Sequence, residues 1–319
     1  MKWKNFSFTI IILVAVAISM TFPQYFTQWG SYELKNAIVP LLQLITFGVG
    51  CSMHVGDFKN LLKMPKGVLI GVACQYTIMP LVGFSIAAIF NFPPEIAAGV
   101  ILIGCSPSGM ASNVMALISK GNLALSVTIT TFATLLAPVM TPLLMQLLGG
   151  TYIEVSFWGM LWDITKILII PIFLGMAMHY LFISKIDRLI RLMPKISMAG
   201  IAFIIVVITA AGRDSLLVVG FALILAMFLH MTVGFSLGYF VARLLRLSER
   251  DCRTIALEVG MQNGGLASGI AASMGKIATL GLAPAVNGPL MNTVFSVIAT
   301  WWAGKKIKDQ TDYDSFIEK

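Results

Sequence analysis

The sequence predicts an all-α membrane protein with ten transmembrane helices. Of its 319 residues, 58% are hydrophobic and 11% are charged, which gives a mean hydropathy of +0.89. Polar side chains are too few to cover a soluble globule of this size. A helix that crosses a bilayer needs roughly 20 apolar residues, and the chain offers ten such stretches. We therefore expect residues 1–319 to form a single unit within the lipid bilayer.

Basic residues mark one side of the predicted bundle. The ten spans are placed at residues 6–24, 34–54, 67–91, 94–119, 123–148, 156–182, 193–211, 215–244, 250–274 and 278–303. All but four of the 22 Lys and Arg residues then fall in alternate loops or at the chain ends; the exceptions are Lys35, Lys166, Arg213 and Lys276. Cytoplasmic loops carry such an excess of basic residues. We expect a multi-pass protein of the inner (plasma) membrane, with both termini cytoplasmic, and no nucleic-acid partner.

The two halves of the chain share a motif. Residues 104–120, GCSPSGMASNVMALISK, align with residues 260–276, GMQNGGLASGIAASMGK, after a shift of 156 positions, with six identities in 17. These segments lie in the fourth and ninth spans, five spans apart. Two five-helix units, 1–150 and 151–305, would therefore enter the membrane in opposite orientations. Such inverted repeats are a transporter architecture, with the binding site near the membrane midplane.

Each copy of the motif interrupts its helix at mid-span. Pro107 has no backbone N–H to donate, and glycines such as Gly104, Gly260 and Gly264 weaken the helix around each break. Unpaired backbone groups in lipid cost several kcal/mol, so a break must lie inside protein or beside an aqueous cavity. Simple kinks with tight helix packing are the alternative. Two breaks at corresponding places favour a site whose free carbonyl groups bind a hard cation.

One acidic residue, Glu258, lies just before the second break in an otherwise apolar or small-residue stretch. A carboxylate at the bilayer centre costs ~3 kcal/mol or more, so a nearby cation is expected; a protonated side chain hydrogen-bonded within the bundle is the alternative. Asp163 has a local partner, Lys166, at i+3. The oxygen-bearing side chains expected around Glu258 are Ser112, Asn113, Ser126, Thr130, Gln75 and Gln262. This set of oxygen ligands suits sodium.

Three segments carry a family resemblance. GCSPSGMASNVM at 104–115, SKGNLALSVTITT at 119–131 and EVGMQNGGLAS at 258–268 resemble the bile acid:sodium symporter family. The likeness covers nearly the whole chain and suggests a bacterial member of the apical sodium-dependent bile acid transporter type. It implies two discontinuous helices that cross, a core domain within 67–148 and 215–303, and a panel domain within 6–54 and 156–211.

The resemblance also implies two transported sodium ions. The first would be bound by Ser112, Asn113, Ser126, Thr130 and Glu258. The second would be bound by Gln75, Glu258, Gln262 and the backbone carbonyl groups of Val259 and Met261. The substrate positions would be Asn263, Met110, Ser108 and Asn292. Met110 and Met291 stand where a relative carries threonine and histidine, so the substrate itself is not implied.

The expected function is sodium-coupled symport of an organic anion by alternating access. The substrate would be a bile acid or a smaller carboxylate such as pantoate, and the protein would be a monomer. A sodium/proton antiporter with the same crossed-helix ion site is the alternative, although a second intramembrane carboxylate would then be expected near the site. A passive channel is a further alternative. An enzyme is not expected, because His54, His179 and His230 are scattered and no HExxH motif occurs.

Overall fold

The computed structural model describes residues 4–53, 64–182, 187–305 and 307. Several residues on which the predicted orientation depends lie outside this part of the chain; they include Lys2, Lys59, Lys63, Lys185 and the basic residues after Lys305. His54 lies outside it as well. The described part is mostly helical, and its strands form one short antiparallel hairpin, β1 (Gln28–Trp29) with β2 (Tyr32–Glu33). The sequence had not indicated this hairpin.

Helices of very different lengths make up the rest. The longer ones are α1 (Lys4–Thr21), α3 (Ile38–Ser52), α5 (Pro65–Phe90), α8 (Leu123–Leu148), α11 (Asp187–Ala211), α12 (Arg213–Leu244) and α15 (Leu282–Ala303). The shorter ones are α2 (Gln24–Thr27), η1 (Leu34–Ala37), α6 (Pro94–Cys105), α7 (Ala111–Ile118), η2 (Gly149–Thr151), α9 (Phe157–Ile164), η3 (Thr165–Ile169), α10 (Ile170–Leu181), α13 (Glu249–Gly260) and α14 (Gly264–Ser273).

Seven helical stretches in the described part are long and apolar enough to cross a membrane. They are Leu34–Ser52, Pro65–Phe90, Leu123–Thr151, Phe157–Leu181, Leu192–Ala211, Arg213–Leu244 and Leu282–Ala303. Large apolar side chains also face outward; Ile89, Val218 and Phe221 are each more than three-quarters exposed. An apolar exterior on this scale suits lipid. The predicted all-α membrane fold is confirmed to this extent, and the count of ten spans stays a prediction. The other three expected spans fall on α1, on α6 with α7, and on α13 with α14.

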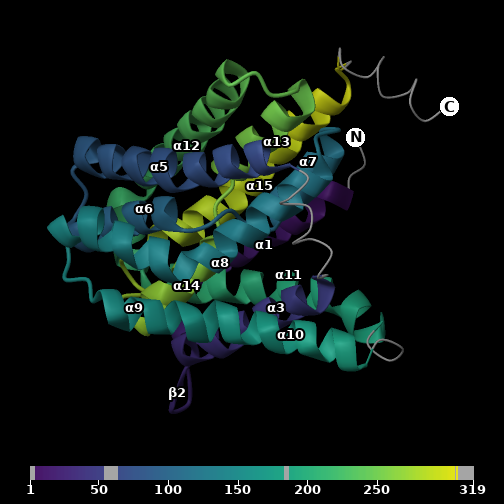
Figure 1. The fold of residues 1–319 in the computed structure, drawn as a ribbon. Coiled ribbons are helices and arrows are strands. Elements are labelled where there is room, and N and C mark those ends of the chain that lie inside the picture. Colours follow the sequence, from purple (N-terminus) through teal and green to yellow (C-terminus); the bar gives the residue numbers. More distant parts are fainter. Residues whose placement is uncertain (1–3, 54–63, 183–186, 306, 308–319) are drawn as a thin grey trace, which may run out of the picture.

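The helices pack in two groups. In the first, which we call the α3 layer, α3 packs against α10 and α11, and α11 packs against α1. In the second, the α5 layer, α5 packs against α6 and α12, and α12 packs against α13 and α15. Figure 1 shows α3, α10 and α11 below, α5, α12 and α13 above, and α8 between them. Among the short helices, α6 packs against α14, and α7 packs against α13.

A π-turn, η3, links α9 to α10 within the expected sixth span. Pro171 has no N–H to donate to the carbonyl group of Ile167, four residues earlier. That carbonyl group instead accepts a hydrogen bond from Thr46 Oγ1 of α3, at 2.8 Å. Gln43 Nε2 of α3 similarly donates to Lys166 O at 3.1 Å. Polar side chains of α3 thus pair backbone groups that the proline leaves free.

Glycine allows α3 and α10 to approach closely. A Cβ atom on Gly50 would overlap the backbone carbonyl group of Ile172, and a Cβ atom on Gly175 would overlap that of Phe47. Helices in membranes use small residues in this way to bring their backbones together. The contact is made by backbone atoms, so no side chain can rotate to accommodate a larger residue there. The packing of the α3 layer therefore depends on these glycines.

We expect Gly175→Ala to lower the melting temperature of the detergent-solubilised protein. The new methyl group would overpack a backbone contact, which typically costs about 1–3 kcal/mol. Gly220→Ala in α12 is the matched control, because nothing lies within 4 Å of its added Cβ. Alanine favours a helix over glycine by about 1 kcal/mol, so the control should be neutral or more stable. Equal melting temperatures for both variants would contradict the close α3–α10 contact.

Candidate ion and substrate site

The structure interrupts the helices at both predicted places. Residues 106–110 separate α6 from α7, and residues 261–263 separate α13 from α14. At the first break, Ser106 is extended with ψ of 152°, because the residue before a proline is driven out of the helical region. Pro107 in turn cannot donate to a preceding carbonyl group. The prediction of two interrupted helices is confirmed.

The two breaks complete each other's backbone hydrogen bonds. Gly109 N donates to Met261 O, and Asn263 N donates to Pro107 O, both at 2.8 Å, which makes a short antiparallel bridge. Backbone groups at membrane depth must find such partners inside the protein. A Cβ atom on Gly109 would lie 2.8 Å from Gln262 O, so glycine is required for this approach. Two of the carbonyl groups expected to be free are thus used in the bridge.

Glu258 lies at the centre of a cluster of hydroxyl groups. Its side chain is fully buried. Its Oε1 accepts hydrogen bonds from Ser112 Oγ and Ser126 Oγ, both at 2.5 Å. Its Oε2 accepts from Ser108 Oγ at 2.7 Å and from Thr130 Oγ1 at 2.8 Å. Four hydroxyl groups, from the first break, α7 and α8, therefore donate to one carboxylate, which α13 carries.

This cluster contains more oxygen acceptors than protons. Asn113 Oδ1 lies 2.8 Å from Ser126 Oγ and 3.2 Å from Thr130 Oγ1. Ser112 Oγ also lies 2.8 Å from Gly109 O. Because a hydroxyl group has one proton, these three hydroxyl groups cannot donate to the carboxylate and to all the other oxygens at once. The surplus lone pairs converge, as the ligands of a hard cation do. All five residues of the first predicted ion site lie together here.

The second predicted ion site is assembled in part. Gln75 Nε2 donates to Gln262 Oε1 at 2.6 Å, and Gln262 Nε2 donates to Val259 O at 2.7 Å. Both glutamine side chains are fully buried. Met261 O accepts the hydrogen bond of the bridge instead. Among the described residues, no hydrogen bond joins either glutamine to the acid.

A cavity of about 490 Å³ separates the α3 layer from the two breaks. Its α3-layer wall is mostly aliphatic, and none of the described residues that line it is charged. Met110, Asn263 and Asn292 of the predicted substrate set line the cavity, as does Met291. The structure places Ser108, the fourth member of that set, elsewhere: it is 1% exposed and bonded to the acid.

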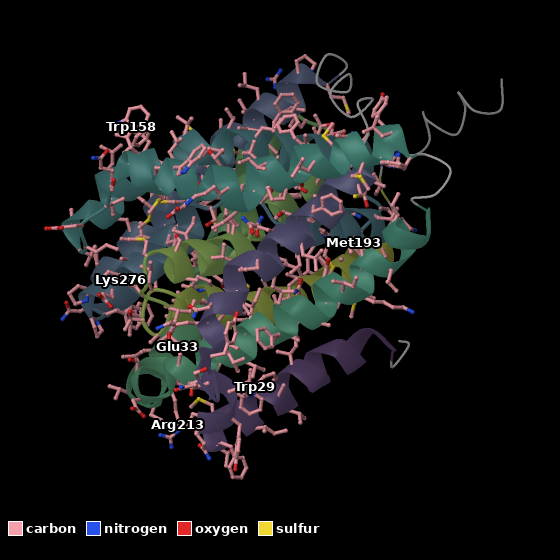
Figure 2. All side chains as sticks on the ribbon, turned by 90° about the horizontal axis from the view of Figure 1, so that it is seen from below. Trp29, Glu33, Trp158, Met193, Arg213 and Lys276 are labelled. Carbon is pink, nitrogen blue, oxygen red and sulfur yellow. The ribbon has the colours of Figure 1, made fainter. Side chains whose placement is uncertain are left out.

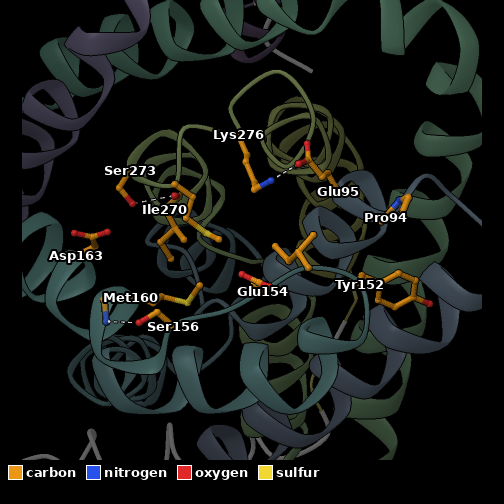
Figure 3. Close-up of a pocket in the computed structure, with 13 residues that line it drawn as sticks. Pro94, Glu95, Tyr152, Glu154, Ser156, Met160, Asp163, Ile270, Ser273 and Lys276 are labelled. Atoms are coloured by element: carbon orange, nitrogen blue, oxygen red, sulfur yellow. Dashed lines mark hydrogen bonds and ion pairs between the residues drawn. The ribbon is translucent and has the colours of Figure 1, made fainter.

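Two further hollows lie at the other ends of α6 and α14. Figure 3 shows the larger, of about 650 Å³, with Glu95 and Lys276 paired at its edge. The same pair borders the second hollow. Figure 2 shows Lys276 at one end of the bundle and Met193, which lines the central cavity, toward the other. Asp163, beside the larger hollow, is 2.8 Å from Lys166, which confirms the local pair predicted from the sequence.

Sequence reasoning missed two side chains that contact the end of α6, just before the first break. Thr141 Oγ1 donates to Cys105 O, at the end of α6, at 2.7 Å. His230 Nε2 lies 3.2 Å from Met79 O and would be 3.0 Å from a Cβ atom on Gly104. Both supports come from helices distant in sequence, and no local motif marks them. No cluster of three or more His, Cys, Asp and Glu residues suited to a metal ion occurs in the described part.

Fold and site together define a class, a multi-pass membrane protein with a buried oxygen-rich cluster at two interrupted helices. The model of the Sodium Bile acid symporter family matches residues 39–219. The chain is 38% identical over 305 residues to an uncharacterized sodium-dependent transporter of Bacillus subtilis, which covers 95% of this chain and 93% of the relative.

Two eukaryotic proteins are similar over most of the chain. A probable chloroplastic sodium/metabolite cotransporter of Arabidopsis thaliana is 32% identical over 282 residues, 88% of this chain and 70% of the relative. The human ileal sodium/bile acid cotransporter is 32% identical over 246 residues, 75% of this chain and 70% of the relative. The chain belongs to the Sodium Bile acid symporter family, a family of sodium-dependent transporters, and it is not an enzyme.

We expect Ser108→Ala to weaken the response to sodium more than the response to the organic substrate. The variant removes one of the four hydroxyl groups that donate to Glu258. Because one lost hydrogen bond of this kind is worth about 1.4 kcal/mol, we expect the sodium concentration for half-maximal uptake to rise roughly tenfold. Uptake is measured against sodium concentration at fixed substrate, and then against substrate at saturating sodium. Thr128→Val is the control, because the hydrogen bond that the described residues give Thr128 Oγ1 goes to Ala124 O of its own helix, at 2.7 Å. A change confined to the substrate KM would return Ser108 to the substrate set.

Proposed function

We propose that this protein is a secondary active transporter that couples the entry of sodium to the uptake of an organic anion. The observation that carries the proposal is the surplus of oxygen acceptors around Glu258, within a fully buried cluster. A carboxylate this deep in a membrane protein needs compensating positive charge. Sodium supplies that charge without requiring protons, and it suits hydroxyl, amide and carboxylate ligands.

Two sodium ions fit the donor groups. The first ion is bound by Ser112, Asn113, Ser126, Thr130 and Glu258, which already converge in the structure. The second is bound at Gln75, Gln262 and Val259 O, where two amide side chains must turn their oxygens toward the ion. Glu258 and the carbonyl group of Met261 complete the second site. Ions therefore hold both breaks in place from one side.

The anion is bound from the other side of the breaks, in the central cavity. The N–H groups of Met110, Ala111 and Gly265 make no hydrogen bond to any residue that the structure describes. They lie where α7 and α14 begin, and helix N-termini favour anions. Asn263 and Asn292 line the same space. Two sodium ions and one carboxylate leave a charge near +1, which a monovalent carboxylate or sulfonate balances.

The two halves act as inverted five-helix repeats, 1–150 and 151–305, in a ten-span protein. Glu95 and Asp251, 156 positions apart, both stand in the first turn of a broken helix. Each accepts a hydrogen bond from a residue just beyond the other broken helix. Thr279 Oγ1 donates to Glu95 at 2.5 Å, and Asn122 Nδ2 donates to Asp251 at 2.8 Å. This correspondence supports two crossing helices related by symmetry.

The division into layers supports transport by alternating access. The α3 layer with α9 corresponds to the panel, and α5–α8 with α12–α15 corresponds to the core. The cavity between them extends to Ser52, at the end of α3, and to Met193, near the start of α11. With both termini in the cytoplasm of a monomer in the inner membrane, these ends face inward. We therefore infer an inward-facing state, from which the core rocks against the panel.

We expect Glu258→Ala to abolish sodium-dependent uptake in proteoliposomes. Labelled taurocholate and pantoate serve as probes, each with and without a sodium gradient, and a panel of small carboxylates competes with them. The variant should also lose thermal stabilisation by sodium, which for an ion at 100 times its Kd amounts to about 2.7 kcal/mol. Asp214→Asn is the control, because this acidic side chain is 95% exposed. Normal sodium-dependent uptake by Glu258→Ala would refute the proposed coupling.

We expect transport of a monovalent anion with two sodium ions to be electrogenic. Each cycle moves one net charge, worth about 2.3 kcal/mol per 100 mV, or roughly a 50-fold change in accumulation. Uptake is measured under potassium diffusion potentials of opposite sign. A pH jump without organic anion tests the sodium/proton antiporter. Sodium-driven proton movement in the pH-jump assay would favour the antiporter. If uptake does not respond to the diffusion potential, two sodium ions per monovalent anion are excluded.

A further inference from the structure

Asn287 has an unpaired polar group deep inside the protein. It lies in α15, and its side chain is fully buried. Its Oδ1 is the one buried side-chain oxygen among the described residues that lacks a hydrogen-bond partner. Within the described part of the chain, its Nδ2 has one weak acceptor, Met291 Sδ, at 3.5 Å. A buried amide oxygen without a partner lowers stability, so its presence in a folded protein requires an explanation.

The position of Asn287 along α15 places it beside the second break. Pro284, one turn before it, has its carbonyl oxygen 3.3 Å from where a Cβ on Gly264 would stand. Met291, one turn after it, packs in the same apolar cluster as Met261. Pro284 and Met291 both line the central cavity. Asn287 contacts Met291, is fully buried, and is not among the residues that line the cavity.

We infer that Asn287 determines substrate specificity by accepting a hydrogen bond from the organic anion. Methionine is unbranched and flexible, so the side chain of Met291, 5% exposed, can swing aside and uncover the amide. The inference rests on the proposed function, in which the anionic group is bound at the N–H groups of the two breaks. Asn287 then meets the part of the substrate next to that group. The favoured substrates carry a hydroxyl or amide N–H donor close to the carboxylate or sulfonate.

The surroundings of Asn287 favour a hydrogen-bond donor over a further cation. A hard cation needs several oxygen ligands, whereas the side chain of Asn287 contacts a methionine sulfur, and that methionine packs in an apolar cluster. That cluster contains Ala116, Met231, Ala256, Leu257, Met261 and Phe295. A single amide oxygen in such surroundings is suited to one N–H or O–H group. Sites built to bind such a group discriminate strongly against analogues that lack it.

The test uses Asn287→Leu, which keeps the size of the side chain and removes the amide. In each of two probe pairs, one member lacks the donor. One pair is pantoate and 4-hydroxy-3,3-dimethylbutanoate, which lacks the 2-hydroxyl group. The other is taurocholate and its N-methyl amide, which lacks the N–H. Sodium-dependent uptake and competition are measured for all four in proteoliposomes, and melting temperatures are measured in detergent.

In the unmodified protein, we expect the donor-bearing member of the transported pair to bind about tenfold more tightly than its partner. Asn287→Leu should remove that preference, leave the donor-less probe unchanged and keep or raise the melting temperature. Tyr76→Phe is the control for stability; its hydroxyl group donates to Ala133 O at 2.6 Å, so its loss should lower the melting temperature.

Each remaining outcome decides against the inference. If Asn287→Leu keeps the preference for the donor-bearing probe, the amide does not bind the donor. An equal loss of affinity for both members of a pair would show the same. A lower melting temperature would show that the amide is paired in the folded protein. If the unmodified protein shows no sodium-dependent uptake of any organic anion, the proposed function fails and this inference fails with it.

Discussion

Two backbone hydrogen bonds at the centre of the molecule, Gly109 N to Met261 O and Asn263 N to Pro107 O, make the rest of the arrangement possible. At membrane depth, an unwound segment cannot turn to water for its missing partners. Each break supplies the partner that the other lacks, so neither break is stable alone. This mutual dependence brings α6, α7, α13 and α14 to one point, and every polar side chain of the site is positioned from there.

The carboxylate of Glu258 is the electrostatic counterpart of this bridge. Four hydroxyl groups reach it from three other segments, which ties α13 to α7 and α8. Three of these hydroxyl groups also lie within hydrogen-bond distance of other oxygen atoms, and with one proton each they cannot donate to all of them. A protein that only stabilised a buried acid would not need this surplus, because fewer acceptors would pair more completely. The surplus is understandable if the cluster must bind an ion and also release it.

The central cavity is shaped by different forces. Its α3-layer wall is mostly aliphatic, and the π-turn in that layer has its carbonyl groups paired by Gln43 and Thr46 of α3. Its other wall is formed by the breaks and α15, where polar groups gather. No described residue that lines the cavity is charged, so under the proposed function N–H groups and bound cations would select the anion instead of basic side chains. The buried amide of Asn287 adds a neutral polar contact behind that wall.

The sequence by itself determined the all-helical membrane fold, the two interruptions and the place of a buried acid, Glu258, beside the second of them. These follow from composition and from local chemistry, because a proline or a lone acid in an apolar stretch has consequences that do not depend on distant residues. The sequence motifs also identified Ser112, Asn113, Ser126 and Thr130 as oxygen-bearing side chains expected near Glu258. It did not indicate the β1–β2 hairpin, the π-turn, or the supports Thr141 and His230, which have no local signal.

Tertiary structure decided which polar groups meet. It moved Ser108 from the cavity to the carboxylate, paired Met261 O with Gly109 N, and left Asn287 Oδ1 without a partner. Each of these outcomes depends on the rotation and depth of one helix relative to another. Periodicity shows which face of a helix is polar, but a shift of one residue in packing changes the partner that this face meets.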